Sequence, residues 1–176
     1  MRRSLVLGSS ILIAAVVAAS FAIAQQDDDD DDEDAVLGGV VKSAPVTLQQ
    51  GFAASAREGT AISGKFEIEV DGAQLSVYTT KDGAYSEVIV DHRSGRIAKV
   101  IPIVDGKDLV EAKQQAEAMR SAQRSLEQVT ESALKGYRGY RAVSATPGGS
   151  ARVKLVLTDG KEWKTVYEPL TPEVKW

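Results

Sequence analysis

Few residues of this chain could carry out chemistry on a substrate. Its 176 residues include no cysteine and one histidine, His92. Without cysteine there is no thiolate nucleophile, no disulfide and no lipid anchor through cysteine, and a lone histidine excludes metal sites built from several imidazoles. A catalytic triad would have to combine His92 with Asp91 and Ser94, which stand beside it in a predicted turn. Neighbours on one tight turn do not converge as a nucleophile and its base must.

Two further sets of side chains could suggest a catalytic or ligand-binding site. Glu67 and Glu69 fall on one face of a predicted strand and could suggest acid-base work, but a polar face of period two is what solvent exposure predicts. Trp163 and Tyr167 share a strand face with Thr165, and packing on a sheet explains them better than a ligand platform does. The sequence therefore predicts a protein that is not an enzyme, with no catalytic residue and no cofactor.

One segment is strongly charged. It consists of eight consecutive acids: Asp27, Asp28, Asp29, Asp30, Asp31, Asp32, Glu33 and Asp34. Like charges repel, so residues 25–45 are predicted to be a disordered acidic linker. The alternative is a loose calcium site, because clustered carboxylates are ligands that calcium accepts. The tract lacks the glycine and the fixed spacing of a calcium loop, which favours the linker.

The charge of the remaining chain is nearly balanced. The whole chain carries −4, of which the acidic tract contributes −8 and Arg2 and Arg3 contribute +2, so the rest carries +2. Its lysines and arginines are scattered among acids. No basic stripe is available to follow phosphates, and the sequence predicts no binding to nucleic acid.

The first 24 residues have the pattern of a secretory signal peptide. Arg2 and Arg3 precede an apolar run from Leu5 to Phe21, and Ala22 and Ala24 supply the small residues that a signal peptidase requires. Cleavage after Ala24 would place the mature protein in the periplasm or outside the cell, with no membrane attachment. The alternative is a retained membrane anchor, because the run approaches the length that spans a bilayer.

Two helix-plus-strand patterns follow the linker. Thr47 and Gln50 form a capping box that predicts a helix over 48–58, and alternating apolar residues predict strands over 65–70, 75–79, 85–90 and 96–101. A longer helix is predicted over 108–133, with a bend near Gln123 or close packing on a sheet, and then strands over 141–146, 152–157 and 163–167. The predicted fold class is α+β, with two units that each combine a helix and an antiparallel meander.

The two patterns share an order of features. Val77–Asp91 and Leu155–Pro169 each give a strand, an Asp-Gly turn, an aromatic residue and a valine-containing strand, at a shift of about 77 residues. This order indicates a divergent internal duplication.

The stretch EVIVDHRSGRIAKV, from Glu87 to Val100, resembles a PepSY domain, whose sheet carries a V-D-x-x-T-G-x-V turn. Asp91, Ser94 and Gly95 match this turn, with Ser94 in place of threonine. The chain from Asp108 to Leu170 resembles the second unit of small exported proteobacterial PepSY proteins, although it lacks the Asp and Gly turn after its last strand. The resemblance implies two tandem PepSY-like units, 46–104 and 105–176.

The same resemblance implies a function without catalysis. PepSY domains occur in propeptides of thermolysin-type metalloproteases and are thought to restrain peptidases. We therefore expect a binding module whose partner is an extracytoplasmic peptidase or another envelope protein, met through an open sheet edge. The alternative is a cation-responsive envelope protein that binds calcium weakly through the Asp-rich tract.

Calorimetry separates these two functions. Because the tract lacks the layout of a calcium loop, titration of calcium into the mature chain should give no heat beyond dilution, with or without Asp27–Asp34. A binding heat that disappears when the tract is deleted would contradict the linker and support the calcium alternative.

Overall fold

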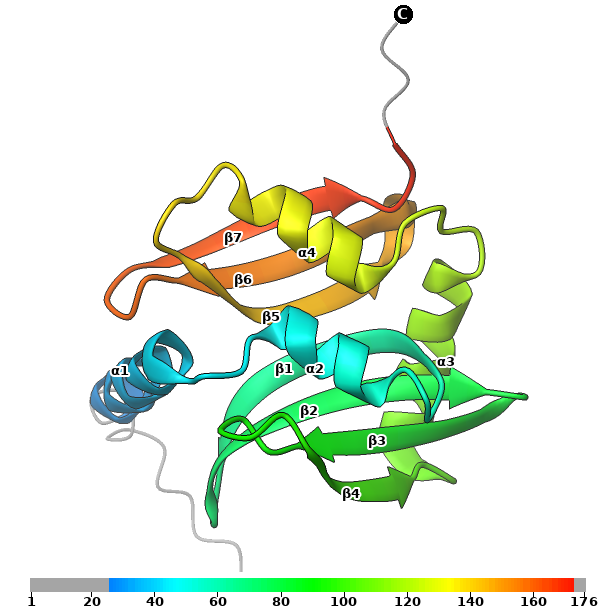
Figure 1. Cartoon of the computed structure of the whole chain (residues 1–176), viewed down its shortest axis with the longest axis horizontal. Helices are drawn as coiled ribbons and strands as arrows, with labels where there is room; N and C mark the ends of the chain where they lie inside the picture. Colours follow the sequence, from blue (N-terminus) through cyan, green and yellow to red (C-terminus); the bar gives the residue numbers. More distant parts are fainter. Residues whose placement is uncertain (1–25, 173–176) are drawn as a thin grey trace, which may run out of the picture.

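The computed structural model describes residues 26–172, which form four α-helices, one short 3-10 helix and seven β-strands (Figure 1). The helices are α1 (Gln26–Ser43), α2 (Leu48–Ser55), α3 (Gly106–Met119) and α4 (Leu126–Leu134), with the 3-10 turn at Gly149–Ala151. The strands are β1 (Thr60–Glu69), β2 (Gly72–Lys81), β3 (Ala84–Val90), β4 (Ile97–Pro102), β5 (Arg141–Gly148), β6 (Arg152–Thr158) and β7 (Trp163–Pro169).

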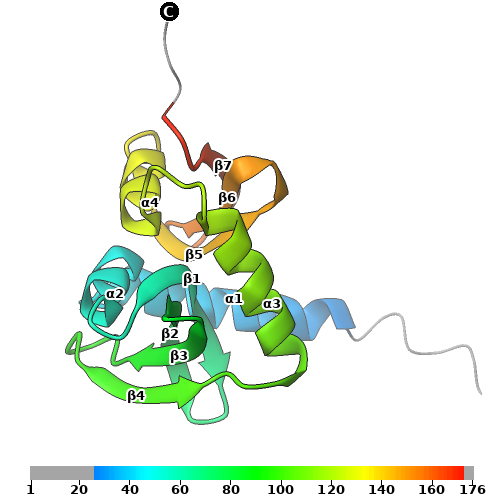
Figure 2. The ribbon, with the colours of Figure 1, turned by 90° about the vertical axis from the view of Figure 1, so that its right-hand side faces the viewer.

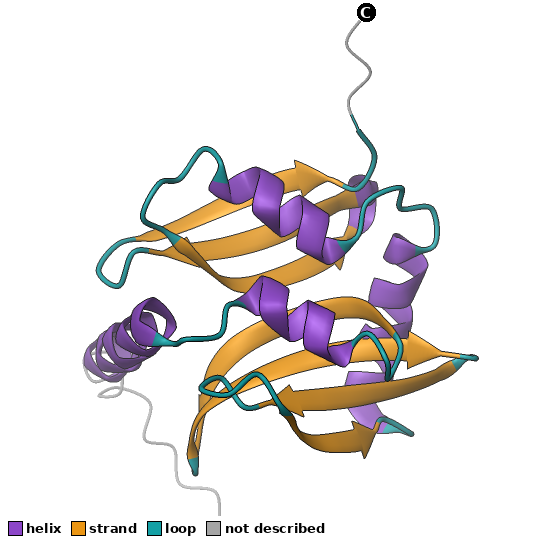
Figure 3. Cartoon of the chain, viewed as in Figure 1, coloured by secondary structure: helices purple, strands orange, loops and turns teal. Residues whose placement is uncertain are grey.

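All seven strands belong to one antiparallel sheet in the order β4-β3-β2-β1-β5-β6-β7. Helices α2 and α4 lie side by side over one face, which we call the α2/α4 face. Helices α1 and α3 lie towards the two ends of the other face, the α1/α3 face (Figures 2 and 3). The sequence prediction of an α+β protein is therefore confirmed, and its two meanders share one continuous sheet.

The hydrophobic core fills the space between the sheet and the pair α2 and α4. Strand residues of period two point into it, as the alternating sequence requires. The strands contribute Phe66, Leu75, Val77, Val88, Val90, Val153, Leu155 and Leu157, and the two helices contribute Leu48, Phe52, Leu126 and Val129. Nearly all apolar burial is thus concentrated on the α2/α4 face.

The helix predicted over 108–133 is two helices. α3 ends at Met119 and lies on the α1/α3 face, whereas α4 begins at Leu126 on the opposite face. Between them the amide nitrogens of Gln123 and Arg124 donate to the carbonyl of Leu170, at 3.0 and 3.1 Å. Ser125 then starts α4 with a capping box, in which its hydroxyl accepts from the amide of Gln128. Periodicity alone could not separate the two helices, because both are amphipathic.

The prediction of a disordered linker over 25–45 is wrong for most of that segment, since Gln26–Ser43 forms α1. Acids fill the N-terminal half of α1 and Lys42 lies in its last turn, an arrangement that the helix dipole favours. The C-terminal half packs on the sheet, with Val41 fully buried. The Nζ of Lys42 donates to the carbonyl of Gly139 at 3.0 Å, which fixes this end to the loop before β5.

The predicted signal peptide, residues 1–24, and its predicted cleavage residues Ala22 and Ala24 lie outside the described residues. None of the helices between residues 26 and 172 combines the length and the hydropathy that crossing a bilayer requires.

Two local features, a helix capping box and a strand bulge, occur once in each half of the fold. Helix α2 begins with a capping box between Thr47 and Gln50, as α4 does between Ser125 and Gln128. Strands β1 and β5 each contain a bulge, at Ile62 in Ala-Ile-Ser and at Val143 in Ala-Val-Ser. Both bulge residues are buried. A bulge increases the local twist of a strand, so the two bulges should affect β1 and β5 in the same way.

Gly64 of β1 allows α2 to approach the sheet closely. A β-carbon at this position would lie 2.6 Å from Cε1 of Phe52, a contact that the buried ring cannot accept without moving. Gly64→Ala should therefore lower the free energy of unfolding by about 1–3 kcal/mol, the usual range for overpacking a core, as measured by urea denaturation.

The matched control is Gly148→Ala at the end of β5, where an added β-carbon meets nothing within 4 Å. It should leave the stability unchanged or raise it slightly, because alanine restricts the unfolded chain. Equal losses in both variants would contradict the proposed close approach.

Candidate functional site

A groove lies on the α1/α3 face of β1 to β4. It has a volume of about 920 Å³ and extends from Val40 of α1 to Asp108 of α3. The sheet forms its floor, and Ala98, Lys99 and Ile101 of the outer strand β4 line one side. The groove exists because α1 and α3 cover only the ends of this face, whereas α2 and α4 take up the apolar face.

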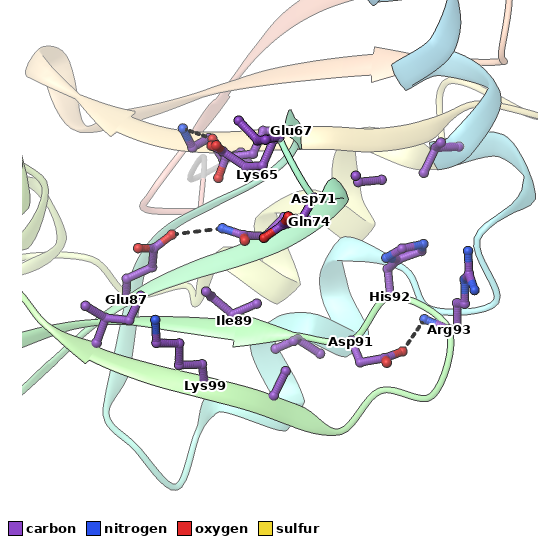
Figure 4. A pocket seen from close by; sticks show the side chains of 18 of the residues that line it. Lys65, Glu67, Asp71, Gln74, Glu87, Ile89, Asp91, His92, Arg93 and Lys99 are labelled. Carbon is purple, nitrogen blue, oxygen red and sulfur yellow. Dashed lines mark hydrogen bonds and ion pairs between the residues drawn. The ribbon is translucent and has the colours of Figure 1, made fainter.

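The floor of the groove carries a fixed polar network (Figure 4). The Oγ of Ser76 donates to Oε1 of Glu87 at 2.7 Å, and Nε2 of Gln74 donates to Ser76 Oγ at 2.8 Å and to Glu87 Oε1 at 3.3 Å. On β1 beside them, Lys65 forms an ion pair with Glu67. Period two places all of these side chains on the same face. Gln74, Ser76 and Glu87 hold one another in position across β2 and β3.

Tyr78 lies at the end of the groove next to α3. Burial raises the pKa of its hydroxyl well above the ordinary value, and the nearby carboxylates of Glu87, Glu67, Asp108 and Glu111 raise the pKa further. These four acids come from β3, β1 and α3. Their convergence means that the potential around Tyr78 is negative and that this end of the groove favours positively charged groups.

The groove continues beneath α3 as a second cavity of about 380 Å³. Lys65, Tyr78 and Asp108 line both spaces. The Oγ of Ser63, on β1, donates to Oε1 of Gln115 at 2.6 Å and thereby fastens α3 to the sheet. Together the two spaces form a cleft that begins at α1 and ends under α3.

The charges that line the groove are unequal. Six of its lining residues are acidic, and three are lysine or arginine. One acid, Asp91, is committed to the turn between β3 and β4, where its Oδ1 accepts from the amides of Arg93 and Ser94, both at 2.8 Å. Gly95 closes this turn with φ of +72°, a value that glycine adopts readily. Asp91 and Gly95 thus have the structural roles that the sequence predicted.

The structure brings some predicted site residues together and separates others. His92 lies next to Asp91 at the rim of the groove, and among the described residues no hydrogen bond joins its imidazole to Asp91 or to Ser94. Glu67 and Glu69 both line the groove, so their face is more than a solvated surface. Trp163, Thr165 and Tyr167 share the α1/α3 face of β7, as their spacing predicted.

Part of the acidic tract, the candidate calcium site, has side chains that the structure does not describe. The side chains of Asp27 to Asp31 are not described, whereas Asp32, Glu33 and Asp34 are exposed on α1. Within the part of the chain whose side chains are described, no group of three or more histidine, cysteine or acidic residues is arranged to hold a metal ion.

The groove itself was missed from the sequence. Its lining includes Gln74, Tyr78 and Glu87, and the buried Ser76 holds Glu87 from below. A signal for them exists, since Gln74, Ser76 and Tyr78 alternate with the buried Leu75 and Val77. Alternation reveals the shared face, but only the position of α1 and α3 shows that this face is hollow.

The comparisons with known proteins give no relative from which a role could be transferred. No family model, curated protein or solved structure matches the chain.

The turn carboxylates make stability depend on pH. Hydrogen bonds from the amides of Ser94 and Arg93 lower the pKa of Asp91, and amides of the β6–β7 turn likewise lower the pKa of Asp159. A lowered folded-state pKa contributes stability above the ordinary value of 3.8, and this stability is lost as the pH falls through the folded value.

Asp91→Asn keeps an acceptor oxygen but cannot ionise. Its free energy of unfolding should therefore fall less steeply than that of the wild type as the pH is lowered from about 5 to about 2, measured by urea denaturation at each pH. Asp159→Asn should behave in the same way. Acid slopes equal to the wild-type slope would contradict the assigned role of these carboxylates.

Proposed function

We propose that this chain is an exported, non-catalytic binding module of the PepSY type, which holds an extended, basic segment of a partner protein in the groove on the α1/α3 face. The observation that carries the proposal is the shape and charge of this groove. It is open, crosses four strands, is lined by more acids than lysines and arginines, and continues into a cleft under α3. In this proposal the mature protein works in the periplasm or outside the cell after cleavage at Ala24.

The dimensions of the groove favour a length of chain over a small molecule. Small-molecule sites are mostly apolar and bury nearly all of their ligand. This groove is wide, polar and walled by two separate helices, and its fixed network offers both donors and acceptors along β2 and β3. A protein segment with peptide groups at regular intervals can use such a surface.

The charge of the groove favours a basic segment. Acids outnumber lysines and arginines two to one along its lining. Around Tyr78 the acids surround an aromatic ring, and the ring face of a tyrosine also attracts ammonium and guanidinium groups. A lysine or arginine of the partner would therefore occupy the end of the groove beside α3.

The tandem PepSY arrangement is part of this proposal. It is supported by the paired capping boxes of α2 and α4 and by the paired bulges of β1 and β5, which recur at nearly the same separation along the chain. In this arrangement the floor of the groove belongs to the first unit, the one that carries the family turn Asp91, Ser94 and Gly95, whereas Val40 precedes that unit and Asp108 belongs to the second. Restraint of a peptidase rests on the resemblance alone, and the partner is either a peptidase or another envelope protein.

A capture experiment with matched variants tests the proposal. The mature chain is immobilised as wild type, as Asp108→Lys and as Glu131→Lys, and envelope proteins retained by each are identified by mass spectrometry. Both variants reverse one exposed acid on a helix, but Asp108 lines the groove and Glu131 lies on α4, across the sheet. A specific partner should be retained by the wild type and by Glu131→Lys and lost with Asp108→Lys.

A synthetic peptide identifies the kind of segment. A ten-residue peptide that alternates lysine with valine should shift backbone amide resonances of β2 and β3 in the mature chain, whereas the glutamate counterpart should not. If a captured partner is a peptidase, the mature chain should slow its hydrolysis of a peptide substrate. Capture that is unaffected by Asp108→Lys, together with shifts that map away from the groove, would refute the proposal.

A further inference from the structure

The two outer strands of the sheet present unequal edges. Alternate residues of an edge strand direct their N–H and C=O groups outward. In β7 the inward residues are even-numbered, because the amide of Leu170 donates to Ala151 and the amide of Asp159 donates to Glu162. Trp163, Thr165 and Tyr167 therefore point their backbone groups away from β6, and no other described strand pairs with them.

The edge of β4 is less able than the edge of β7 to pair with a further strand. The register of β4 against β3 shifts next to Ala98, and Pro102 occupies an outward position without an N–H group. A bulge and a proline are the usual means by which an edge strand avoids further pairing. Because β7 also has a proline at an outward position, Pro169 at its end, the bulge is what sets the two edges apart. Strand β7 pairs with β6 in uninterrupted register from Trp163 to Pro169. Its edge is thus the one that remains competent to accept another strand.

The sequence of β7 is complementary to itself when reversed. Lys164, Val166 and Glu168 share the α2/α4 face of the strand. If two copies of β7 lie antiparallel about an axis through Val166, each Lys164 faces Glu168 of the second copy, and the two Val166 side chains face each other. Opposite charges and valines directly across a ladder stabilise antiparallel pairing, whereas like charges oppose it.

We propose that the edge of β7 is a self-association site, through which two copies of this chain pair antiparallel about Val166 and join their sheets. On the other face of the strand, each Thr165 lies opposite Tyr167 of the second copy, and each Trp163 lies opposite Pro169. The outward groups of the two strands form about six backbone hydrogen bonds, with the Pro169 positions contributing only their carbonyls. The site is separate from the groove, which lies over β1 to β4.

The alternative registers are less favourable. A shift of two residues preserves the outward groups. In one direction it places Val166 opposite Glu168 and loses both charge pairs, and in the other it places Lys164 opposite Val166 and brings Glu168 opposite Glu162 of the second copy. This second shift exchanges two attractive pairs for repulsive ones. Within one chain, Lys164 contacts Glu162 at 3.3 Å and Glu168 contacts Arg124 at 3.8 Å. Because Lys164 and Glu162 are well exposed, their contact is weak and can be exchanged easily.

The molecule already contains a junction of this type. Strands β1 and β5 join the two meanders antiparallel, and α2 and α4 pack side by side above that junction. Pairing through β7 would likewise bring two copies of α4 onto a common face of an extended sheet. A closed two-fold pair leaves no further β7 edge, so association stops at the dimer.

Sedimentation equilibrium of the mature chain over a hundredfold concentration range tests the association. The average mass should rise from that of the monomer towards that of the dimer, and less so in high salt because the charge pairs are screened. Thr165→Pro removes an outward N–H and should give monomer throughout, with an unchanged circular dichroism spectrum. The matched change Val100→Pro removes an outward N–H from β4 and should leave the dimer intact.

Charge reversal tests the register. Lys164→Glu places two like-charged pairs across the proposed axis and should abolish the dimer, whereas the double variant Lys164→Glu with Glu168→Lys should restore it. A wild-type chain that stays monomeric at all concentrations would overturn the proposal. So would a dimer that survives Thr165→Pro, or a double variant that fails to recover association.

The absence of cysteine allows a direct measurement of the axis. Val166→Cys places one thiol on each side of the two-fold axis, at a pair that is not hydrogen-bonded and whose Cα atoms lie about 4.5 Å apart. Mild oxidation should therefore give a covalent dimer on a non-reducing gel. Tyr167→Cys, whose neighbour across the ladder is Thr165, should stay uncrosslinked, and equal crosslinking of both variants would contradict this register.

Discussion

The short pairing of β1 with β5 is the contact on which the architecture depends. Only Gly64 with Ala145 and Lys65 with Ser144 form this ladder, yet it joins the two meanders into one sheet. Gly64 and Ala145 are small and lie under α2 and α4, so the helices can pack closely over the junction. The aromatic ring of Phe52 occupies the space that a side chain at Gly64 would need.

This distribution of packing explains why the opposite face is available for binding. The pair α2 and α4 buries nearly all of the apolar strand residues, and the α1/α3 face of β1 to β3 carries polar side chains that satisfy one another through hydrogen bonds. A polar face satisfied in this way needs no protein layer above it. Helices α1 and α3 therefore flank the groove and leave its centre open.

Much of the fold could be predicted from the sequence, since the strands follow period two and the Asp-Gly turns stand where the hairpins close. Thr47 and Gln50 gave the start of α2 correctly. The break between α3 and α4 was harder to find, because it depends on hydrogen bonds to Leu170, almost fifty residues away. The helical state of the acidic segment was missed for a related reason: Val41 and Lys42 are held by contacts with the sheet and the loop before β5, which no local pattern encodes.

The site was only partly foreseeable. Asp91 and Gly95 serve the turn that their types suggest, since a local sequence determines a local turn. The groove depends on where two helices distant in the chain, α1 and α3, come to rest on the sheet. Four carboxylates gather around Tyr78 from three elements, and their spacing in the sequence contains no sign of this convergence.

Helix α1 makes contacts on both sides of the junction, with β1 and with β5 and β6. Beyond its end, Nη1 of Arg141 donates to the carbonyls of Lys42 and Ala44, at 3.2 and 2.6 Å. The segment that precedes Pro45 therefore contacts both meanders and stabilises the junction between them. A shortened chain that begins after this segment would lose these contacts, and its two halves would be joined only by the ladder of two residue pairs and by the packing of α2, α3 and α4 across it.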